Sequence, residues 1–327
     1  MTSEQDRQIG WIGLGSMGLA MATNLQKHLQ NTNGRHLKYW NRTMSRGDTL
    51  QELGGEPCPT IEDLVQACSL IFISLSDDAA LHSITTTILS SGPLTSKIIT
   101  DTTTVHPETS TSIASKLTSA GALYVSAPVF GATPVAQAGH LLIAVGGPPP
   151  AISSISPYLT GVLARAVIPV GPDPHTALLL KTTSNYLTAG LMYLLSEAHT
   201  LAAKTGLPAP VLESLVELNL GAYALAVSQR LTSGAYFPAE GQVPRSGLEL
   251  GIKDVRHGVS LASGQGMRGT VGELYLEAAE EARAYAEGKG RRCDSSGVFG
   301  VVRQRAGLEF ETEGVRERDG RGKRGDE

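Results

Sequence analysis

The pattern of apolar and polar positions changes character near residue 170. Before it, short apolar runs alternate with longer amphipathic segments, and turn residues or polar stretches bound each run. Such runs are typical of buried parallel strands, and their alternation with helical segments predicts an α/β fold with a doubly wound parallel sheet of the Rossmann class. The expected strands cover residues 70–76, 97–103, 122–129 and 141–147.

After residues 171–174 (GPDP) the strand pattern ends and helical periodicity takes over. We therefore predict a Rossmann domain over residues 1–172 and an all-α domain over residues 173–308. Residues 309–327 carry many charges of both signs and few apolar side chains, which predicts a disordered tail. The expected helices cover residues 175–205, 208–219, 221–232, 247–263 and 270–287.

A glycine-rich turn follows the first expected strand. The segment RQIGWIGLGSMG passes from an apolar strand through Gly13, Gly15 and Gly18 into a helix. In that context the first glycine permits a tight turn, the second lets the backbone approach a pyrophosphate, and the third brings the helix close to the strand. Dinucleotide binding is the prediction, and a tight turn without a ligand is the alternative. The residues between the glycines belong to the same predicted site: Leu14, Ser16 and Met17.

The end of the second expected strand, HLKYWNRT, bears on the choice of dinucleotide. An NAD enzyme usually has an acidic residue there to hold the ribose hydroxyls, whereas this chain has Asn41, Arg42 and Thr43. An arginine accepts a 2′-phosphate that a carboxylate would repel, and the first acidic residue, Asp48, comes too late. NADP(H) is therefore the predicted cofactor, with NAD(H) as the second candidate. A solvated arginine at a strand end is the alternative reading of Arg42.

Lys181 and Asn185 stand one turn apart in the apolar helical segment TALLLKTTSNYLTAGLMYLL. A lysine in apolar surroundings loses its proton more easily than a surface lysine, so it can exchange protons with a substrate oxygen. The spacing places the Asn185 amide on the same helix face. These two residues are the predicted catalytic pair. The alternative is a lysine that extends toward solvent beside a hydrogen-bonded core amide.

Seven motifs in this order resemble the β-hydroxyacid dehydrogenase family, which is 3-hydroxyisobutyrate dehydrogenase-like and related to phosphogluconate dehydrogenase. The resemblance runs from about Ile9 to about Leu308. It implies a Rossmann domain followed by a helical domain, and an oxidoreductase that interconverts a carbonyl compound and its alcohol. The motifs are GLGSMG (13–18), LSDD (75–78), DTTTVHP (101–107), APVFGATPVAQAG (127–139), Lys181 with Asn185, KD (253–254) and Asp294 before two serines.

The resemblance also implies roles for individual residues. Lys181 matches the catalytic lysine and Asn185 its partner, and both would contact the substrate. Lys253 matches a lysine that closes over the nicotinamide end of the cofactor. The family's helical domain commonly forms the subunit contact, which implies a homodimer or a larger homo-oligomer. Residues matching other cofactor-lining positions are Leu75, Ser76 and Thr104.

One position departs from the family pattern. The family usually has Ser-Gly where this chain has Phe130-Gly131, and the serine hydroxyl and nearby N–H groups hold a substrate carboxylate. The Gly131 N–H group can still serve, but the hydroxyl is missing and a ring fills the wall. Phe130 and Gly131 are therefore predicted substrate contacts. The substrate is expected to be a carbonyl or hydroxy compound that is bulkier or more apolar than 3-hydroxyisobutyrate.

Composition narrows the partners. A net charge of −4 and a pI of about 6.1 provide no field for nucleic acid. Cys58, Cys68 and Cys293 have no metal-ligand or disulfide spacing, and the eight histidines show none either, so no metal site is expected. The uncharged run Thr182–Ser196 is too short to span a membrane, and the N-terminus has no secretory pattern. We expect a cytoplasmic protein.

Three functions follow from these observations. The first is an NADP(H)-dependent oxidoreductase in which Lys181 is the general acid for carbonyl reduction. The second is an imine reductase, an offshoot of the same family that usually lacks the lysine kept here. The third is a non-catalytic NADPH-binding regulatory protein, for which Phe130 is the one supporting feature.

Overall fold

The computed structural model describes residues 7–322. The chain divides into two compact units, Met1–Thr182 and Thr183–Glu327. The division falls inside helix α8 (Pro174–Thr205), later than the domain boundary expected at 172/173. The start of α8 belongs to the first unit because Ala177 and Leu178 are fully buried in that unit's core.

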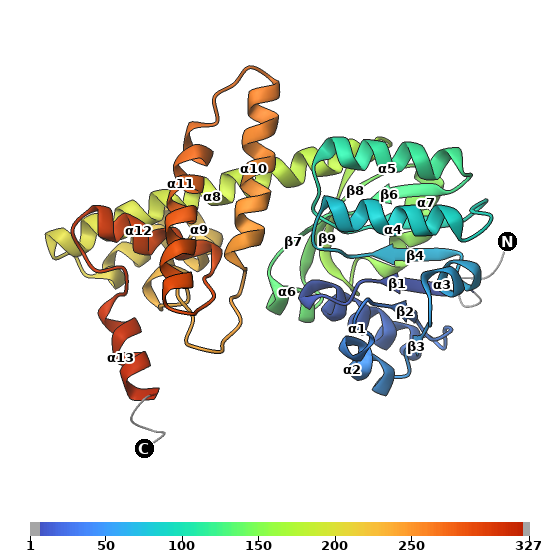
Figure 1. Ribbon diagram of the computed structural model, residues 1–327, viewed down its shortest axis with the longest axis horizontal. Coiled ribbons are helices and arrows are strands. Elements are labelled where there is room, and N and C mark those ends of the chain that lie inside the picture. Colours follow the sequence, from blue (N-terminus) through green and yellow to red (C-terminus); the bar gives the residue numbers. More distant parts are fainter. Residues whose placement is uncertain (1–6, 323–327) are drawn as a thin grey trace. The chain divides into compact units, whose positions relative to one another are not determined.

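The first unit is built on a nine-stranded sheet over the described residues, with the order β3-β2-β1-β4-β5-β6-β8-β7 and β9 paired to β8 (Figure 1). The strands from β3 to β6 pair in parallel, as the sequence predicts. The strands are β1 (Ile9–Ile12), β2 (Lys38–Trp40), β3 (Glu56–Pro57), β4 (Leu70–Ile73), β5 (Ile98–Asp101), β6 (Leu123–Ser126), β7 (Val129–Phe130), β8 (Leu141–Gly146) and β9 (Ala164–Gly171).

The direction of β8 corrects one expectation. The run 141–147 is predicted as a parallel strand, but β8 pairs antiparallel with β6 and β7, and parallel only with β9. The connection from β7 to β8 is short and holds only the small helix α6 (Thr133–Gln137), which is less than a parallel crossover requires. An apolar run shows that a strand is buried but carries no information on its direction.

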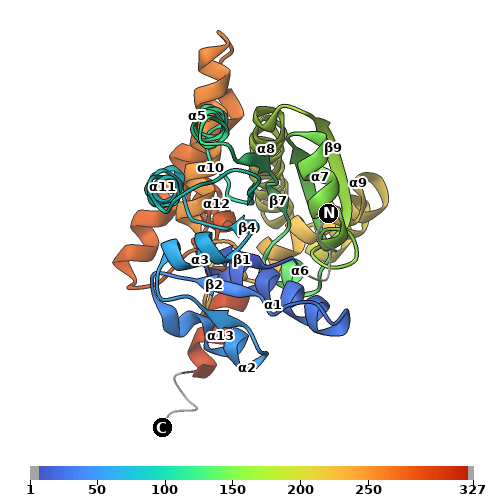
Figure 2. The same ribbon diagram turned by 90° about the vertical axis from the view of Figure 1, so that its right-hand side faces the viewer.

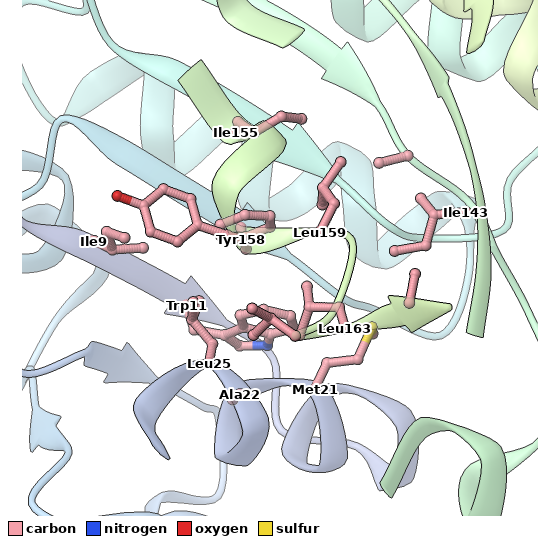
Figure 3. Packing of buried hydrophobic residues seen from close by; sticks show 14 of the residues in the cluster. Ile9, Trp11, Met21, Ala22, Leu25, Ile143, Ile155, Tyr158, Leu159 and Leu163 are labelled. Carbon is pink, nitrogen blue, oxygen red and sulfur yellow. The ribbon is translucent and has the colours of Figure 1, made fainter. Parts of the chain in front are cut away.

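Helices cover both faces of the sheet because successive side chains of each strand point to opposite sides. Trp11 belongs to a cluster with α1 and α7 (Figure 3). Its ring stacks on Phe72 at 5.3 Å between centroids. The neighbouring Ile12 belongs to a second cluster with α3, α4 and α5. The other helices of this unit are α1 (Ser16–Asn31), α2 (Asp48–Glu52), α3 (Ile61–Ala67), α4 (Asp78–Ser90), α5 (Pro107–Ser119) and α7 (Pro149–Ile155).

The second unit consists of helices and connecting loops and has no strand among its described residues, as predicted (Figure 2). It has its own buried cluster. The two helices expected over 208–219 and 221–232 form one element, α9, which is interrupted at Gly221 with φ of 85°. Besides the rest of α8, the helices are α9 (Ala209–Thr232), α10 (Leu248–Gly264), α11 (Thr270–Gly288), α12 (Val298–Arg305) and α13 (Glu313–Gly322).

The expected disordered tail is wrong for residues 309–322. Phe310 and Val315 are buried in the second unit's core, and the Phe310 ring stacks on Tyr285 at 3.8 Å. An ion pair of 2.6 Å joins Arg291 to Asp319 of α13. Two apolar side chains are enough to hold this segment because they pack against an aromatic cluster that the rest of the unit already forms. The remainder of the expected tail, residues 323–327, lies outside the described residues.

Candidate functional site

The glycine-rich turn has the geometry of a phosphate-binding loop. Gly13 has φ of +97°, and a Cβ there would lie 2.2 Å from the Ser74 carbonyl oxygen. A Cβ on Gly18 would lie 2.2 Å from the Gly13 carbonyl oxygen, so these two positions need glycine for close packing. Gly15 is exposed, and its Cβ position has no atom within 4 Å in the described structure. This open backbone is the place where a pyrophosphate fits.

The start of α1 is also suited to an anion. Within the described part of the chain, α1 has no side-chain cap and no acidic residue in its first turn. Its first N–H groups therefore remain available, together with the positive end of the helix dipole. Ser16 is exposed and Met17 half-buried at this end. The residues present thus fit the diphosphate of a dinucleotide.

The end of β2 is attached to this turn through Asn41. The Leu14 N–H group donates to Asn41 Oδ1 at 2.9 Å, and Asn41 Nδ2 donates to the Thr43 carbonyl oxygen at 2.7 Å. Arg42 and Thr43 are exposed beside it. Arg46, four positions after Arg42, is exposed as well and was missed by sequence reasoning, although the segment NRTMSR contains both arginines.

The turns after β4 and β5 complete this edge of the sheet. Since β1 leads to β2 on one side and β4 lies on its other side, the glycine turn sits at the switch point where open α/β sheets bind ligands. Leu75 follows β4, and its Cδ2 lies 3.0 Å from a Cβ built on Gly13. The predicted residues Ser76, exposed, and Thr104, half-buried, lie in these two turns.

A buried carboxylate fixes the same edge. Asp101 accepts hydrogen bonds from Tyr124 Oη at 3.0 Å and from the Thr103 N–H group at 2.9 Å. Thr103 Oγ1 in turn accepts from the Leu75 N–H group at 3.1 Å. Burial raises the pKa of Asp101 to about 6, against the lowering effect of these donors. Asp101 therefore organises the cofactor-side turns without being exposed to a ligand.

Phe130 and Lys181 meet within the first unit. The Lys181 Nζ atom lies 4.9 Å from the centroid of the Phe130 ring, a cation–π distance. Both side chains are half-buried. Phe130, expected as a substrate wall, thus also contacts the amine of the predicted catalytic lysine. At Gly131, φ is 135° and a Cβ would lie 2.8 Å from Leu141 Cδ2, so this position requires glycine.

A second contact brings the Phe130–Gly131 turn toward the glycine-rich turn. Thr133 Oγ1 donates to Met17 Sδ at 3.7 Å, and Asn24 Nδ2 donates to the Ala136 carbonyl oxygen at 2.8 Å. Helix α6 therefore packs along α1, and Figure 2 shows the two helices side by side. The predicted cofactor turn and the predicted substrate turn are thus neighbours in the first unit.

The predicted residues of the second unit are joined by Asp254. Asn185 Nδ2 donates to Asp254 Oδ2 at 2.8 Å, and Lys253 Nζ lies 3.1 Å from Asp254 Oδ1. Asn185 follows Lys181 by one turn of α8 but belongs to the second unit. Sequence reasoning named the pair KD without a role for its acid. The signal was an acidic residue next to a lysine in the middle of an amphipathic helix.

Asp294 has a structural role. Its carboxylate is fully buried and paired with Arg230, and it accepts from the Ser246 and Ser296 N–H groups at 2.9 and 3.0 Å. Every donor comes from the second unit's own loops and helices. The late Asp-Ser-Ser motif thus joins separate segments of the helical unit.

The three cysteines are free and buried, as expected for small apolar side chains. Burial raises the pKa of both the Cys68 and the Cys293 thiol to about 12, so neither is a thiolate near neutral pH. They offer no nucleophile to the site.

Comparison with known proteins gives a consistent picture. Residues 8–171 match the family described as the NAD binding domain of 6-phosphogluconate dehydrogenase. The chain is 28% identical over 301 residues to the NADH-dependent oxidoreductase ucdB of Aspergillus ustus, covering 90% of this chain and 99% of that protein. It is also 28% identical to glyoxylate/succinic semialdehyde reductase 1 of Arabidopsis thaliana, over 90% of this chain and 98% of that protein.

Solved structures share the fold. A Mycobacterium tuberculosis 3-hydroxyisobutyrate dehydrogenase with L-serine superposes with a TM-score of 0.76 at 20% identity, covering 91% of this chain and 99% of that one. A Streptomyces aurantiacus imine reductase has a TM-score of 0.58 at 22% identity, with coverage of 90% and 99%. At these identities the likeness concerns the fold alone.

Proposed function

Because the chain belongs to the family of the NAD-binding domain of 6-phosphogluconate dehydrogenase, and is an NAD(P)-dependent oxidoreductase of the 3-hydroxyisobutyrate dehydrogenase-like kind, we propose that it reduces a carbonyl compound with NADPH or oxidises the corresponding alcohol. When bound, the nicotinamide supplies or accepts the hydride. The protein's own task is to hold the two reactants and to move a proton.

Lys181 is the proton donor in this proposal. The observation that carries it is the contact between the Lys181 amine and the Phe130 ring, on the turn next to the cofactor segment. An aromatic ring orients an ammonium group without accepting its proton. Lys181 Nζ donates a proton to the developing alkoxide in reduction, and takes it back in oxidation.

The residues that would hold NADPH are those of the glycine turn and the β2 end. The open Gly15 backbone and the α1 N-terminus take the diphosphate, and Arg42 pairs with the 2′-phosphate. Leu75, Ser76 and Thr104 belong to the turns at the same edge, and the family resemblance gives Lys253 a role toward the nicotinamide. One relative is named as NADH-dependent, so the preference of this chain has to be measured.

The substrate in this proposal is a carbonyl compound with an apolar part. Phe130 replaces a hydroxyl that would hold a small carboxylate, and its ring offers apolar surface instead. Gly131 contributes backbone, and Asn185, which Asp254 holds, orients the amine or binds the same oxygen. One relative is named for two small acids, glyoxylate and succinic semialdehyde, whereas the Phe130 ring favours a substrate with an apolar part here.

We also propose a cytoplasmic homo-oligomer formed through the second unit. Its helices expose two apolar stripes at helical spacing, Leu187, Leu194 and Leu201 on α8 and Val211, Leu215 and Leu218 on α9. By length and composition alone, α9 could cross a membrane, the one such helix among the described residues, which differs from the expectation of no such segment. The break at Gly221 and the acids Glu213 and Glu217 argue against it. A monomer in light scattering at micromolar concentration would contradict the oligomer.

An imine reductase is the second candidate because such an enzyme shares the fold. Lys181 argues against it, since a retained general acid serves a carbonyl oxygen. A protein that binds NADPH without catalysis is the third candidate.

Oxidation of NADPH with a panel of aldehydes, keto acids and cyclic imines tests all three. We expect turnover of aldehydes or keto acids, and a loss of about 10²- to 10⁴-fold in Lys181→Ala and in Lys181→Arg. Binding of NADPH should stay within about twofold, since the amine acts on the substrate. Lys116, an exposed lysine of the same unit, gives a matched control in Lys116→Ala. Turnover of imines alone, or near-native rates in Lys181→Ala, would refute the proposal.

A further inference from the structure

A cavity of about 490 Å³ lies in the first unit, away from the glycine-rich turn. Three segments form it: the C-terminal half of α1, the loop after α6, and the turn that leads into β9. The glycine turn is at the other end of α1. Since a helix rises by about 1.5 Å per residue, the distance along α1 from Ser16 to His28 is roughly 18 Å. The cavity is therefore separate from the predicted diphosphate site.

The walls of the cavity are held in place by packing. The inner face of α1 carries Met21, Ala22 and Leu25, which Figure 3 shows in the cluster of Trp11. Gly139, with φ of +69°, packs so closely on the turn before β9 that a Cβ would lie 2.7 Å from the Val162 carbonyl oxygen. The three segments consequently keep a fixed spacing, and the cavity is a feature of the fold.

The lining is cationic. Lys27 and Arg165, both exposed, contribute basic side chains, His28 and His140 add imidazoles, and no acidic residue lines the cavity among the described residues. Neither Lys27 nor Arg165 has a carboxylate within ion-pair distance in the described part of the chain. Within the described residues, Arg35 and Lys116 of the same unit have no ion pair either, so the distinctive feature of the cavity is that four basic side chains line one space. In a chain with net charge −4, this acid-free group of cations stands out.

The helix dipole explains only part of this charge. The C-terminal end of α1 carries a partial negative charge, which Lys27 and His28 on the same helix offset. Arg165 belongs to β9 and His140 to the loop before β8, so the dipole gives no reason for these two groups. Their convergence on the same cavity points to an external anion.

We propose that this cavity binds a small organic dianion through phosphate or paired carboxylate oxygens. Arg165 can present two parallel N–H groups to such a ligand, and Lys27 a point charge. Asn31 and Thr160, which also line the cavity, offer neutral donors. The volume lies within the usual range for small-molecule sites, and it leaves room for a carbon skeleton beside the anionic group.

Calorimetric titration with inorganic phosphate and with malonate tests the proposal on protein saturated with NADPH, so that the cofactor site does not take the probe. We expect saturable binding with a Kd below about 10 mM for at least one probe. The tighter probe distinguishes a phosphate ligand from a dicarboxylate. The double variant Lys27→Gln/Arg165→Gln should weaken binding by about tenfold or more.

The double variant Arg35→Gln/Lys116→Gln is the matched control. It removes two exposed cations of the same unit that do not line the cavity, with the same change in net charge. The control should bind the probe within about twofold of the wild type. Absence of saturable binding in the wild type, or an equal loss in both double variants, would overturn the proposal. The comparison of the two variants also remains valid for a protein that does not bind NADPH.

Discussion

Replacing Phe130 by leucine removes the aromatic ring while keeping an apolar side chain. The ring centroid lies 4.9 Å from Lys181 Nζ, and both side chains are half-buried. Cation–π contacts contribute about 0.5–1 kcal/mol when exposed and about 2 kcal/mol when desolvated. If the ring holds the amine in position for proton transfer, Phe130→Leu should lower kcat/KM by roughly 2- to 30-fold. Phe130→Tyr keeps a ring and should stay within about threefold.

The assay is kcat/KM for the best carbonyl substrate, with NADPH affinity measured by fluorescence as the control. Affinity for NADPH should not change, because Phe130 contacts the lysine and lies outside the predicted phosphate contacts. Equal kcat/KM values in Phe130→Leu and the wild type would refute the idea that the ring orients the amine. An equal loss in the leucine and tyrosine variants would assign the effect to packing.

Phe130→Ser separates orientation from substrate selection. It removes the ring and restores the hydroxyl that the family uses for a carboxylate, so small hydroxy acids should gain relative to apolar substrates. Full burial of the ring against an apolar substrate would contribute about 1.5–3 kcal/mol, and a half-buried ring about half of that. If kcat/KM falls by one common factor for 3-hydroxyisobutyrate and for an apolar substrate, Phe130 acts only through Lys181.

Three further measurements test other parts of the site. Arg42→Ala should weaken NADPH binding by roughly ten- to a hundredfold and leave NADH binding unchanged; equal loss for both cofactors would contradict 2′-phosphate pairing. Asp101→Asn should change the pH dependence of stability. Burial raises the folded-state pKa of Asp101 from 3.8 to about 6, so the folded state binds this proton more tightly than the unfolded state. The stability that this protonation contributes is fully present below about pH 3.8 and is lost as the pH rises through about 6. The free energy of unfolding of the wild type, measured against Asp101→Asn, should fall by up to about 3 kcal/mol from about pH 4 to pH 8; parallel curves would contradict this. A Gly15 substitution should lower affinity for both cofactors, since its open backbone faces the diphosphate; unchanged affinities in Gly15→Val would move the phosphate site elsewhere.

Local patterns predicted the elements that depend on local interactions. The glycine turn and the helix bounds of the second unit follow from periodicity, breakers and backbone freedom, and the interruption of α9 falls at Gly221 between two predicted helices. The direction of β8 and the folding of residues 309–322 onto the second unit depend on partners far away in the chain. Phe310 packs on Tyr285, and no property of the charged segment itself announces that contact.

The same distinction holds for the site. Gly13, Gly18 and Phe130 were singled out with a role from motif positions, whereas Asp101 and Asp254 stand in the motifs DTTTVHP and KD without a role. Asp101 reaches Leu75 through Thr103, and Asp254 joins Asn185 to Lys253. Such supporting residues are acids with no distinctive sequence spacing, so only the folded arrangement reveals which side chains they hold.

The contact with Lys181 changes the interpretation of Phe130. In the sequence it was the one feature that favoured a non-catalytic NADPH-binding protein, because a hydroxyl used for substrate binding is absent. In the structure its ring faces the Lys181 amine. Such a contact stabilises the ammonium form and fixes its direction, which suits a group that must be protonated before it donates to a substrate oxygen. The substitution at 130 therefore favours an enzyme with a changed substrate over a protein that has lost its reaction.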